Sequence, residues 1–206
     1  MAALFPRILL RVALVDLTQR IVECERCPRL RAWCTEVAET KRAAFRNEVY
    51  WGRPVPPLGD PDARGLIVGL APAAHGANRT GRLFTGDRSG DWLFRALFRA
   101  GLANQPHAVS ADDGLELRNV LIMPVVACAP PANKPLPEEI LNCRPYVAEM
   151  LASREWNAIL CLGGIAWQNL FATLGARPPT EFGHGAEAQV GATTFLASYH
   201  PSQQNT

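Results

Sequence analysis

The chain contains no hydrophobic run that approaches the ~20 residues needed to span a bilayer. Residues 1–7 lack the basic start, long apolar segment and cleavage site of a secretory signal. Charge of one sign is also scarce, because 21 Lys and Arg residues stand against 19 Asp and Glu residues, for a net charge of +2. These absences argue against a membrane protein, a secreted protein and a uniformly basic nucleic-acid-binding chain, so we expect a cytoplasmic protein.

Internal repeats and low-complexity tracts are absent as well, whereas hydrophobic residues make up 48% of the 206 positions. This length and composition suit one globular domain with a sizeable core. We therefore expect a single domain over residues 1–206, in which residues 1–46 supply an N-terminal helix and a cysteine region.

Apolar, β-branched runs alternate with helical patterns along the chain. The four predicted strands cover residues 65–70, 119–126, 158–163 and 192–198. The predicted helices cover residues 7–22 and 91–100, begin at Pro137, and begin again after Gly164. Strands without polar alternation suit a sheet that is buried on both faces, so the sequence predicts an α/β fold with a mostly parallel four-stranded sheet.

Capping and turn residues mark the limits of these elements. Ser89 or Asp91 is predicted to cap the start of the helix over 91–100, and Gly101 to end it. Pro54, Pro56, Pro57, Gly59 and Pro61 fall within residues 47–64, which indicates an irregular connector before the first strand.

The glycine-rich segment 69–86 joins the first predicted strand to the helix over 91–100. It holds four glycines, which let backbone amides approach a ligand, and two arginines, which offer forked donors to phosphate. Ligands bind parallel sheets at the carboxyl ends of strands, where this segment begins. A long surface turn is the alternative. The segment lacks the Gly-Lys-Ser/Thr ending of a P-loop, which weakens a third hypothesis, a phosphate-binding transferase.

Basic residues are concentrated between positions 79 and 99. Five arginines there stand against two acidic residues, Asp87 and Asp91, which leaves a local charge of +3. Such a bias fits a phosphate-facing patch or the solvated face of a helix, and charge alone leaves both open.

Cysteine spacing indicates a metal site. Cys24 and Cys27 form a C-x2-C pair, and Cys128 and Cys143 follow far downstream. Four thiolates that converge in space suit an iron–sulfur cluster or an all-thiolate zinc site. Six reduced thiols without metal are the alternative.

The remaining cysteines and the histidines need separate interpretations. Cys161 lies in an apolar strand and is predicted to be a core residue, and Cys34 to be a bystander. His200 directly follows a strand and precedes a proline, which restricts its backbone to extended conformations. Ser202 lies close by in the sequence, and His75 is a second candidate with weaker context.

Four ordered motifs together resemble the family 5 uracil-DNA glycosylases, the type called UDGb. They are GLAPAAHGANRTGR over 69–82, FTG over 84–86, CAPPANKP over 128–135 and HPSQQN over 200–205. The resemblance runs from about Cys24 to the end of the chain. It implies a three-layer α/β/α domain with a structural 4Fe–4S cluster, whose ligands would be Cys24, Cys27, Cys128 and Cys143.

The resemblance implies a base-excision repair enzyme. It would flip uracil or another deaminated base, including hypoxanthine and ethenocytosine, out of duplex DNA and hydrolyse the N-glycosidic bond to leave an abasic site. We expect it to act on double-stranded DNA as a monomer, with no membrane partner, near the nucleoid of a bacterial or archaeal cytosol. The alternative is a non-catalytic, metal-stabilised nucleic-acid-binding protein.

The matching motifs also imply roles for single residues. His200 would donate a hydrogen bond to a carbonyl oxygen of the leaving base, and Phe84 would stack on the flipped base. Backbone groups of Gly69, Ala71 and Ala73 would line the pocket. The remaining substrate-binding residues would be His75 and Asn205. The expected contacts to DNA phosphates are Arg79, Arg82 and Ser202.

The attacking water lacks an evident partner, because Ala71 stands where the wider superfamily often carries an acidic or amide residue. The candidates that could position water are His75, Asn78, Asp87 and Asn133. Of these, Asn78 and Asn133 join His200 as the expected catalytic set. We expect little general-base help and a reaction driven mostly by stabilisation of the leaving base.

Two further departures concern specificity and length. Related families place a base-reading asparagine before Cys128, where this chain has Met123 and Pro124, so a broad lesion range is expected. Relatives continue past the histidine motif with a helix, whereas this chain stops at Thr206. We therefore expect it to be truncated at its C terminus, with Gln203 and Gln204 where others carry an apolar wedge.

Overall fold

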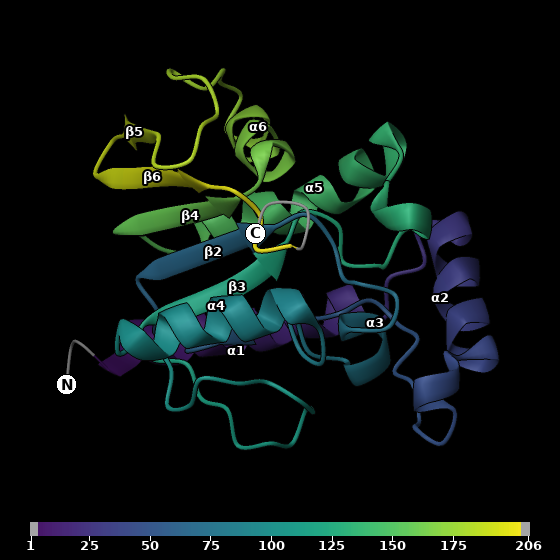
Figure 1. Cartoon of the computed structure of the whole chain (residues 1–206). Helices are drawn as coiled ribbons and strands as arrows, with labels where there is room; N and C mark the ends of the chain where they lie inside the picture. Colours follow the sequence, from purple (N-terminus) through teal and green to yellow (C-terminus); the bar gives the residue numbers. More distant parts are fainter. Residues whose placement is uncertain (1–3, 203–206) are drawn as a thin grey trace.

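A six-stranded sheet, counted over the described residues 4–202, runs through the middle of the computed structural model (Figure 1). Its order is β1-β3-β2-β4-β6-β5. The strands are β1 Leu58–Gly59, β2 Gly65–Gly69, β3 Val120–Pro124, β4 Ala158–Leu162, β5 Glu187–Val190 and β6 Thr193–Ser198. The four predicted strands correspond to β2, β3, β4 and β6, which pair in parallel. The prediction of a mostly parallel α/β sheet is confirmed, and the short antiparallel edges β1 and β5 are additions to it.

Helices cover both faces of the sheet (Figure 1). They are α1 Leu4–Val22, α2 Pro28–Thr40, α3 Ala77–Thr80, α4 Arg88–Arg99, α5 Pro137–Ala152 and α6 Gly164–Thr173, with 3-10 turns at Ala43–Phe45 and Pro131–Asn133. On β2, Leu66 and Val68 pack in one core with α1, α5 and α6, whereas Ile67 packs in a second core with α4. This alternation produces the three layers, because neighbouring side chains of a strand point to opposite faces.

The helix boundaries differ from the predicted ones at two places. The α4 helix starts at Arg88, and its N-cap is Asp87 rather than Ser89 or Asp91, since the Asp87 carboxylate accepts from the Gly90 N–H at 2.9 Å. The α2 helix was not predicted, although Pro28 at its first turn is a typical start signal. None of the helices in the described part of the chain has the length and apolar character required to cross a membrane.

Three loops meet at the carboxyl ends of the parallel strands. The Val125 N–H donates to the Gly69 carbonyl at 2.8 Å, which ties the start of the glycine-rich loop to the segment after β3. The Gly163 N–H donates to the Ser198 carbonyl at 2.8 Å, which joins the ends of β4 and β6. The predicted site residues on these loops are therefore neighbours at one edge of the sheet.

Candidate functional site

His200 stands two residues after the end of β6, next to the turn that follows β4. A Cβ added at Gly163 would lie 3.7 Å from the His200 Cβ, and Gly163 has a φ of +97°, which favours glycine. The Ser202 N–H donates to the His200 carbonyl at 2.7 Å, forming a tight turn. This turn and the Gly163 backbone hold the histidine at the edge of the sheet.

Phe84 of the glycine-rich loop faces His200. The two ring centroids are 6.0 Å apart, and the ring planes meet at 30°. A Cβ at Gly69 would lie 3.1 Å from the Phe84 Cζ atom, so the glycine leaves room for the ring. The structure thus brings together the two residues to which the resemblance gives base stacking and base hydrogen bonding.

Asp87 is the acidic member of this group. A Cβ at Gly76 would lie 2.3 Å from the Asp87 Oδ2 atom, so glycine at position 76 is what allows the carboxylate to lie there. Burial raises the pKa of Asp87, while hydrogen bonds from the Gly90 and Ser89 N–H groups oppose the rise. Burial therefore disfavours the charged form of this carboxyl group, which is typical of functional acids.

The imidazole of His200 is shifted in the opposite sense. Burial lowers the pKa of His200, and the nearby negative charge of Asp87 partly offsets this shift. A neutral imidazole can still donate one N–H hydrogen bond. Phe84, Asp87 and His200, called here the candidate site, therefore combine an apolar ring, a hydrogen-bond donor and an anionic acceptor.

Backbone donors add to the candidate site. The N–H groups of Ala71 and Ala73, both in half-buried residues, have no hydrogen-bond acceptor among residues 4–202. The Ala73 carbonyl accepts from the Gly76 and Asn78 N–H groups at 3.2 and 3.0 Å, which fixes the loop. The two amides thus remain available to a ligand, in line with the expected backbone lining.

His75 is held by Tyr50, which the sequence did not single out. The Tyr50 hydroxyl lies 3.1 Å from the His75 Nδ1 atom and accepts from the Arg42 N–H at 3.4 Å. The Tyr50 hydroxyl donates to Nδ1 or accepts from it, depending on which ring nitrogen of His75 carries the proton. Burial lowers the pKa of His75, and the charges of Arg42 and Arg79 lower it further. No pattern in the sequence links positions 50 and 75.

Arg79 turns inward in this structure, and its expected contact to a DNA phosphate stays a prediction. It is only 6% exposed, forms an ion pair with Glu48 and donates from Nε to the His75 carbonyl at 2.8 Å. Its guanidinium also lies 3.9 Å from the centre of the Phe45 ring. The side chain is therefore used inside the protein to hold the loop.

Arg82 and Asn78 also turn inward. Arg82 is 8% exposed and forms an ion pair with Asp113 at 2.7 Å, and its expected contact to phosphate stays a prediction. Asn78 has no exposed surface, and its Nδ2 donates to the Cys34 carbonyl at 3.3 Å, which links α3 to α2. Its buried Oδ1 has no hydrogen-bond partner among the described residues, and its expected catalytic role stays a prediction.

The other predicted residues are less constrained. Asn133 is exposed, with a φ of +55°, and no hydrogen bond or ring contact among the described residues joins its side chain to the candidate site. Ser202 is half-buried beside His200. Asn205, Gln203 and Gln204 lie outside the described residues.

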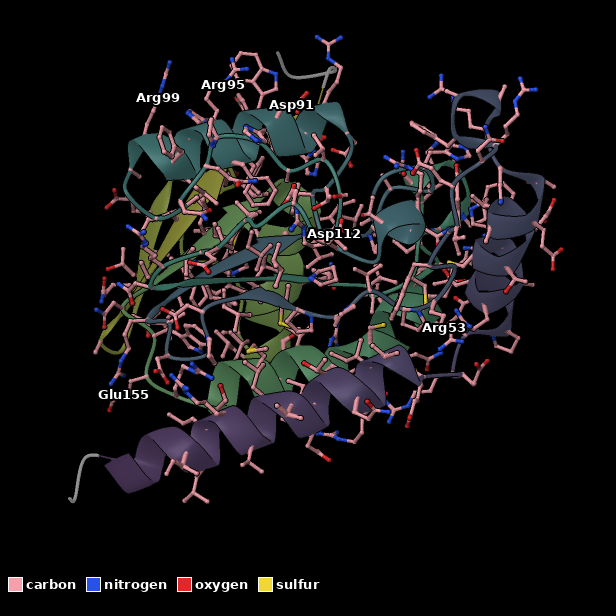
Figure 2. The ribbon with its side chains drawn as sticks, turned by 90° about the horizontal axis from the view of Figure 1, so that it is seen from below. Arg53, Asp91, Arg95, Arg99, Asp112 and Glu155 are labelled. Atoms are coloured by element: carbon pink, nitrogen blue, oxygen red, sulfur yellow. The ribbon has the colours of Figure 1, made fainter. Side chains whose placement is uncertain are left out.

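The arginines between 79 and 99 divide into two groups. Arg79 and Arg82 are buried, whereas Arg88, Arg95 and Arg99 are exposed on α4. Arg95 and Arg99 project from α4 away from the sheet (Figure 2). The local charge of +3 therefore combines internal ion pairing with a solvated helix face.

The four predicted metal ligands belong to one core region, where the segment between α1 and α2, the segment after β3 and α5 meet. Cys27, Cys128 and Cys143 are buried in one core cluster, and Cys24 packs against it. Burial raises the pKa of Cys143 to about 11, with added contributions from Cys27 and Cys24, so the sulfur atoms influence one another. The donor set is entirely thiol and lies in apolar surroundings.

Cys34, predicted to be a bystander, is a fifth thiol in this region. It is fully buried, and a hydrogen bond with Cys128 lowers its pKa while raising the pKa of Cys128. Cys161 lies apart in β4, where burial raises its pKa to about 12, as expected for a core residue. Within residues 4–202, no three His, Cys, Asp or Glu side chains are arranged to hold a metal ion.

The comparisons with known proteins agree with this arrangement. Residues 56–206 match the family model described as the uracil DNA glycosylase superfamily. A type-5 uracil-DNA glycosylase from Mycobacterium tuberculosis is 52% identical over 198 residues, covering 94% of this chain and 74% of that protein. Those from Pyrobaculum aerophilum and Thermus thermophilus are 48% and 49% identical, covering 92% and 91% of this chain and 83% and 86% of theirs. The chain therefore belongs to the uracil DNA glycosylase superfamily, among its type-5 members.

Proposed function

We propose that the chain excises uracil from DNA by hydrolysing the N-glycosidic bond. The observation that carries this proposal is the meeting of Phe84, Asp87 and His200 at the carboxyl edge of the sheet, where the rings of Phe84 and His200 lie 6.0 Å apart. The relatives named above are uracil-DNA glycosylases, and the chain is similar to them over more than nine tenths of its length.

Stabilisation of the leaving base is the main catalytic device in this proposal. As the bond to the sugar breaks, negative charge develops on the carbonyl oxygens of uracil. The N–H of a neutral His200 and the amides of Ala71 and Ala73 can donate hydrogen bonds to these oxygens. Because these donors are neutral, no cation has to lose its hydration shell first. Phe84 stacks on the flipped base and keeps water away from it.

Asp87 is the residue that we propose to hold the attacking water. The sequence left His75, Asn78, Asp87 and Asn133 as candidates. Asn78 is fully buried, and His75 is engaged by Tyr50 at 3.1 Å. Asn133 has no described contact with the candidate site, whereas the Asp87 carboxylate lies beside His200 and bears a pKa that burial raises. A carboxylate of this kind orients water and stabilises positive charge on the sugar.

Double-stranded DNA is the proposed partner, and Arg42 is a proposed phosphate contact in place of Arg79 and Arg82. Arg42 is exposed, and its charge lowers the pKa of His75, so it lies close to the glycine-rich loop. Duplex substrates, a lesion range that includes hypoxanthine and ethenocytosine, the monomeric state and the cytoplasmic location stay predictions from the sequence.

A 4Fe–4S cluster on Cys24, Cys27, Cys128 and Cys143 is proposed as a structural group. Four thiols in apolar surroundings fit the donor set of such a cluster, which would supply cross-linking and no step of the reaction. These residues join the end of α1 and the start of α2 to α5. We expect Cys143→Ala to lose iron and visible absorbance, while Cys161→Ala, which changes another buried cysteine in β4, keeps both. Equal iron content in the two variants would contradict this ligand set.

The experiment that tests the function uses a duplex with a single uracil, followed by alkaline cleavage of abasic sites. Strand breaks at the uracil position are expected for the wild-type protein and should be nearly absent for His200→Ala. Parallel arms with single-stranded uracil DNA, hypoxanthine and ethenocytosine define the substrate range. Binding of the duplex without any cleavage at high protein concentration would instead support the non-catalytic alternative.

A further inference from the structure

Arg82 uses every nitrogen of its guanidinium inside the protein. Its Nε donates to the Thr85 hydroxyl at 2.9 Å, one terminal nitrogen donates to Asp113 Oδ2 at 2.7 Å, and the other donates to the Ala111 carbonyl at 3.3 Å. The side chains of Arg82 and Asp113 are 9% and 6% exposed. Burial of two charges so far from solvent costs desolvation free energy. We therefore expect this ion pair to have a role other than solubility.

Asp113 organises the loop between α4 and β3. Besides Arg82, it accepts from the Val109 and Leu115 N–H groups at 2.7 and 3.0 Å. Burial alone would raise the pKa of Asp113, but the hydrogen bonds from Arg82, Val109 and Leu115 lower it, so the carboxylate stays charged. One aspartate therefore fixes both this loop and the guanidinium.

In the sequence, Phe84 lies between Arg82 and Thr85, whose side chains are joined by a hydrogen bond. Its φ of +52° is uncommon for a residue with a side chain. Arg82 and Thr85 flank it within the network, and the Gly86 N–H donates to the Ala108 carbonyl of the same loop at 2.8 Å. The backbone on either side of the ring is thus anchored to the segment around Asp113.

We propose that Arg82 and Asp113 are positioning residues for Phe84 and hold its ring where it stacks on the flipped base. This inference rests on the proposed function. A stacking ring acts only when its plane and distance are fixed before the base arrives, since a displacement of about 1 Å weakens catalysis strongly. The buried Arg82–Asp113 ion pair supplies that rigidity, because it ties the glycine-rich loop to the loop between α4 and β3. The second loop carries no residue of the candidate site.

The test compares Arg82→Met, Asp113→Asn and the double variant with the wild-type protein. The double variant matters because it leaves no unpaired buried charge. Three quantities are measured: the single-turnover excision rate at saturating protein, inhibition by free uracil, and affinity for an undamaged duplex at several salt concentrations. We expect excision to slow about tenfold or more and inhibition by uracil to weaken, with duplex affinity unchanged within about twofold.

A core variant on the opposite face, Leu17→Ala in α1, controls for lost stability. If it slows excision as much as the Arg82 and Asp113 variants at matched unfolding midpoints, the positioning role is wrong. Weaker binding to undamaged duplex, with a salt slope lowered by about one, would instead make Arg82 a phosphate contact. Should Arg82→Met fail to fold, Thr85→Val removes the hydrogen bonds of the Thr85 hydroxyl with Arg82 and with the Leu83 carbonyl, and its result is interpreted in the same way. Loss of excision by the wild-type protein would concern the proposed function and not the positioning role.

Discussion

Two pairs of ionisable residues in and around the glycine-rich loop differ in how their charges are balanced. Arg79 and Arg82 are buried and engaged by Glu48, Asp113 and backbone carbonyls, so their charges are compensated within the protein. Asp87 and His200 are partly buried, and this burial shifts the pKa of each toward its neutral form. The first, compensated pair stabilises the shape of the loop. The second, reactive pair has the shifted pKa values that are typical of functional groups.

The sharpest test of this contrast removes the donor of the second pair. His200→Ala should lower the single-turnover excision rate by about 10²–10³-fold, the typical cost of one donor to a developing anion. His107→Ala changes an exposed histidine elsewhere and should leave the rate unchanged. A loss of less than about tenfold in His200→Ala would mean that other groups, such as the Ala71 and Ala73 amides, carry the leaving-group stabilisation.

Asp87→Asn separates activity from stability. Because burial raises the pKa of Asp87 in the folded state, the stability linked to this group is present at low pH and lost as pH rises through the folded pKa. The asparagine still accepts from Gly90 but carries no charge, so the melting temperature at pH 7 should rise by about 2–4 °C. Excision should fall about 100-fold, and the acid limb of its pH profile should disappear.

The matched control for this variant is Asp91→Asn on the exposed face of α4, labelled in Figure 2. It should lower the melting temperature slightly, because Asp91 lies in the first turn of α4, and it should leave the excision rate unchanged. A lower melting temperature in Asp87→Asn would show that the carboxylate is stabilising where it lies. It would then belong with the compensated pair, Arg79 and Arg82.

The sequence predicted the candidate site better than the compensated pair, Arg79 and Arg82. The parallel strands and the placement of Phe84 and His200 follow from apolar runs and ordered motifs, which are local signals. The inward course of Arg79 and Arg82 depends on Glu48 and Asp113, which are 31 residues away in each case. Arginine between glycines fits phosphate binding as well as internal pairing, and only the tertiary structure separates the two. The same limit hid Tyr50, the partner of His75.

Gly90→Ala tests whether the backbone beneath Phe84 is as rigid as the ion pair implies. A Cβ at Gly90 would lie 1.8 Å from the Phe84 carbonyl oxygen, so either α4 or Phe84 must move. We expect excision to slow about tenfold and the protein to lose about 1–3 kcal/mol of stability. Gly183→Ala, where a Cβ meets nothing within 4 Å, is the control. Unchanged excision in Gly90→Ala would show that the position of Phe84 tolerates such a shift.

Of these variants, Arg42→Ala should have the smallest effect. It tests whether Arg42, an exposed arginine near the glycine-rich loop, contacts a DNA phosphate. If the buried arginines are structural, phosphate contact passes to exposed ones, and loss of one contact should weaken duplex binding about threefold and lower the salt slope by about 0.9. Arg177→Ala, an exposed arginine after α6, should leave both unchanged. The excision rate at saturating protein should stay the same in Arg42→Ala, because a positioning contact to phosphate acts on affinity and not on the bond that breaks. Equal salt slopes for Arg42→Ala and wild type would contradict this role and leave the DNA face to the arginines of α4.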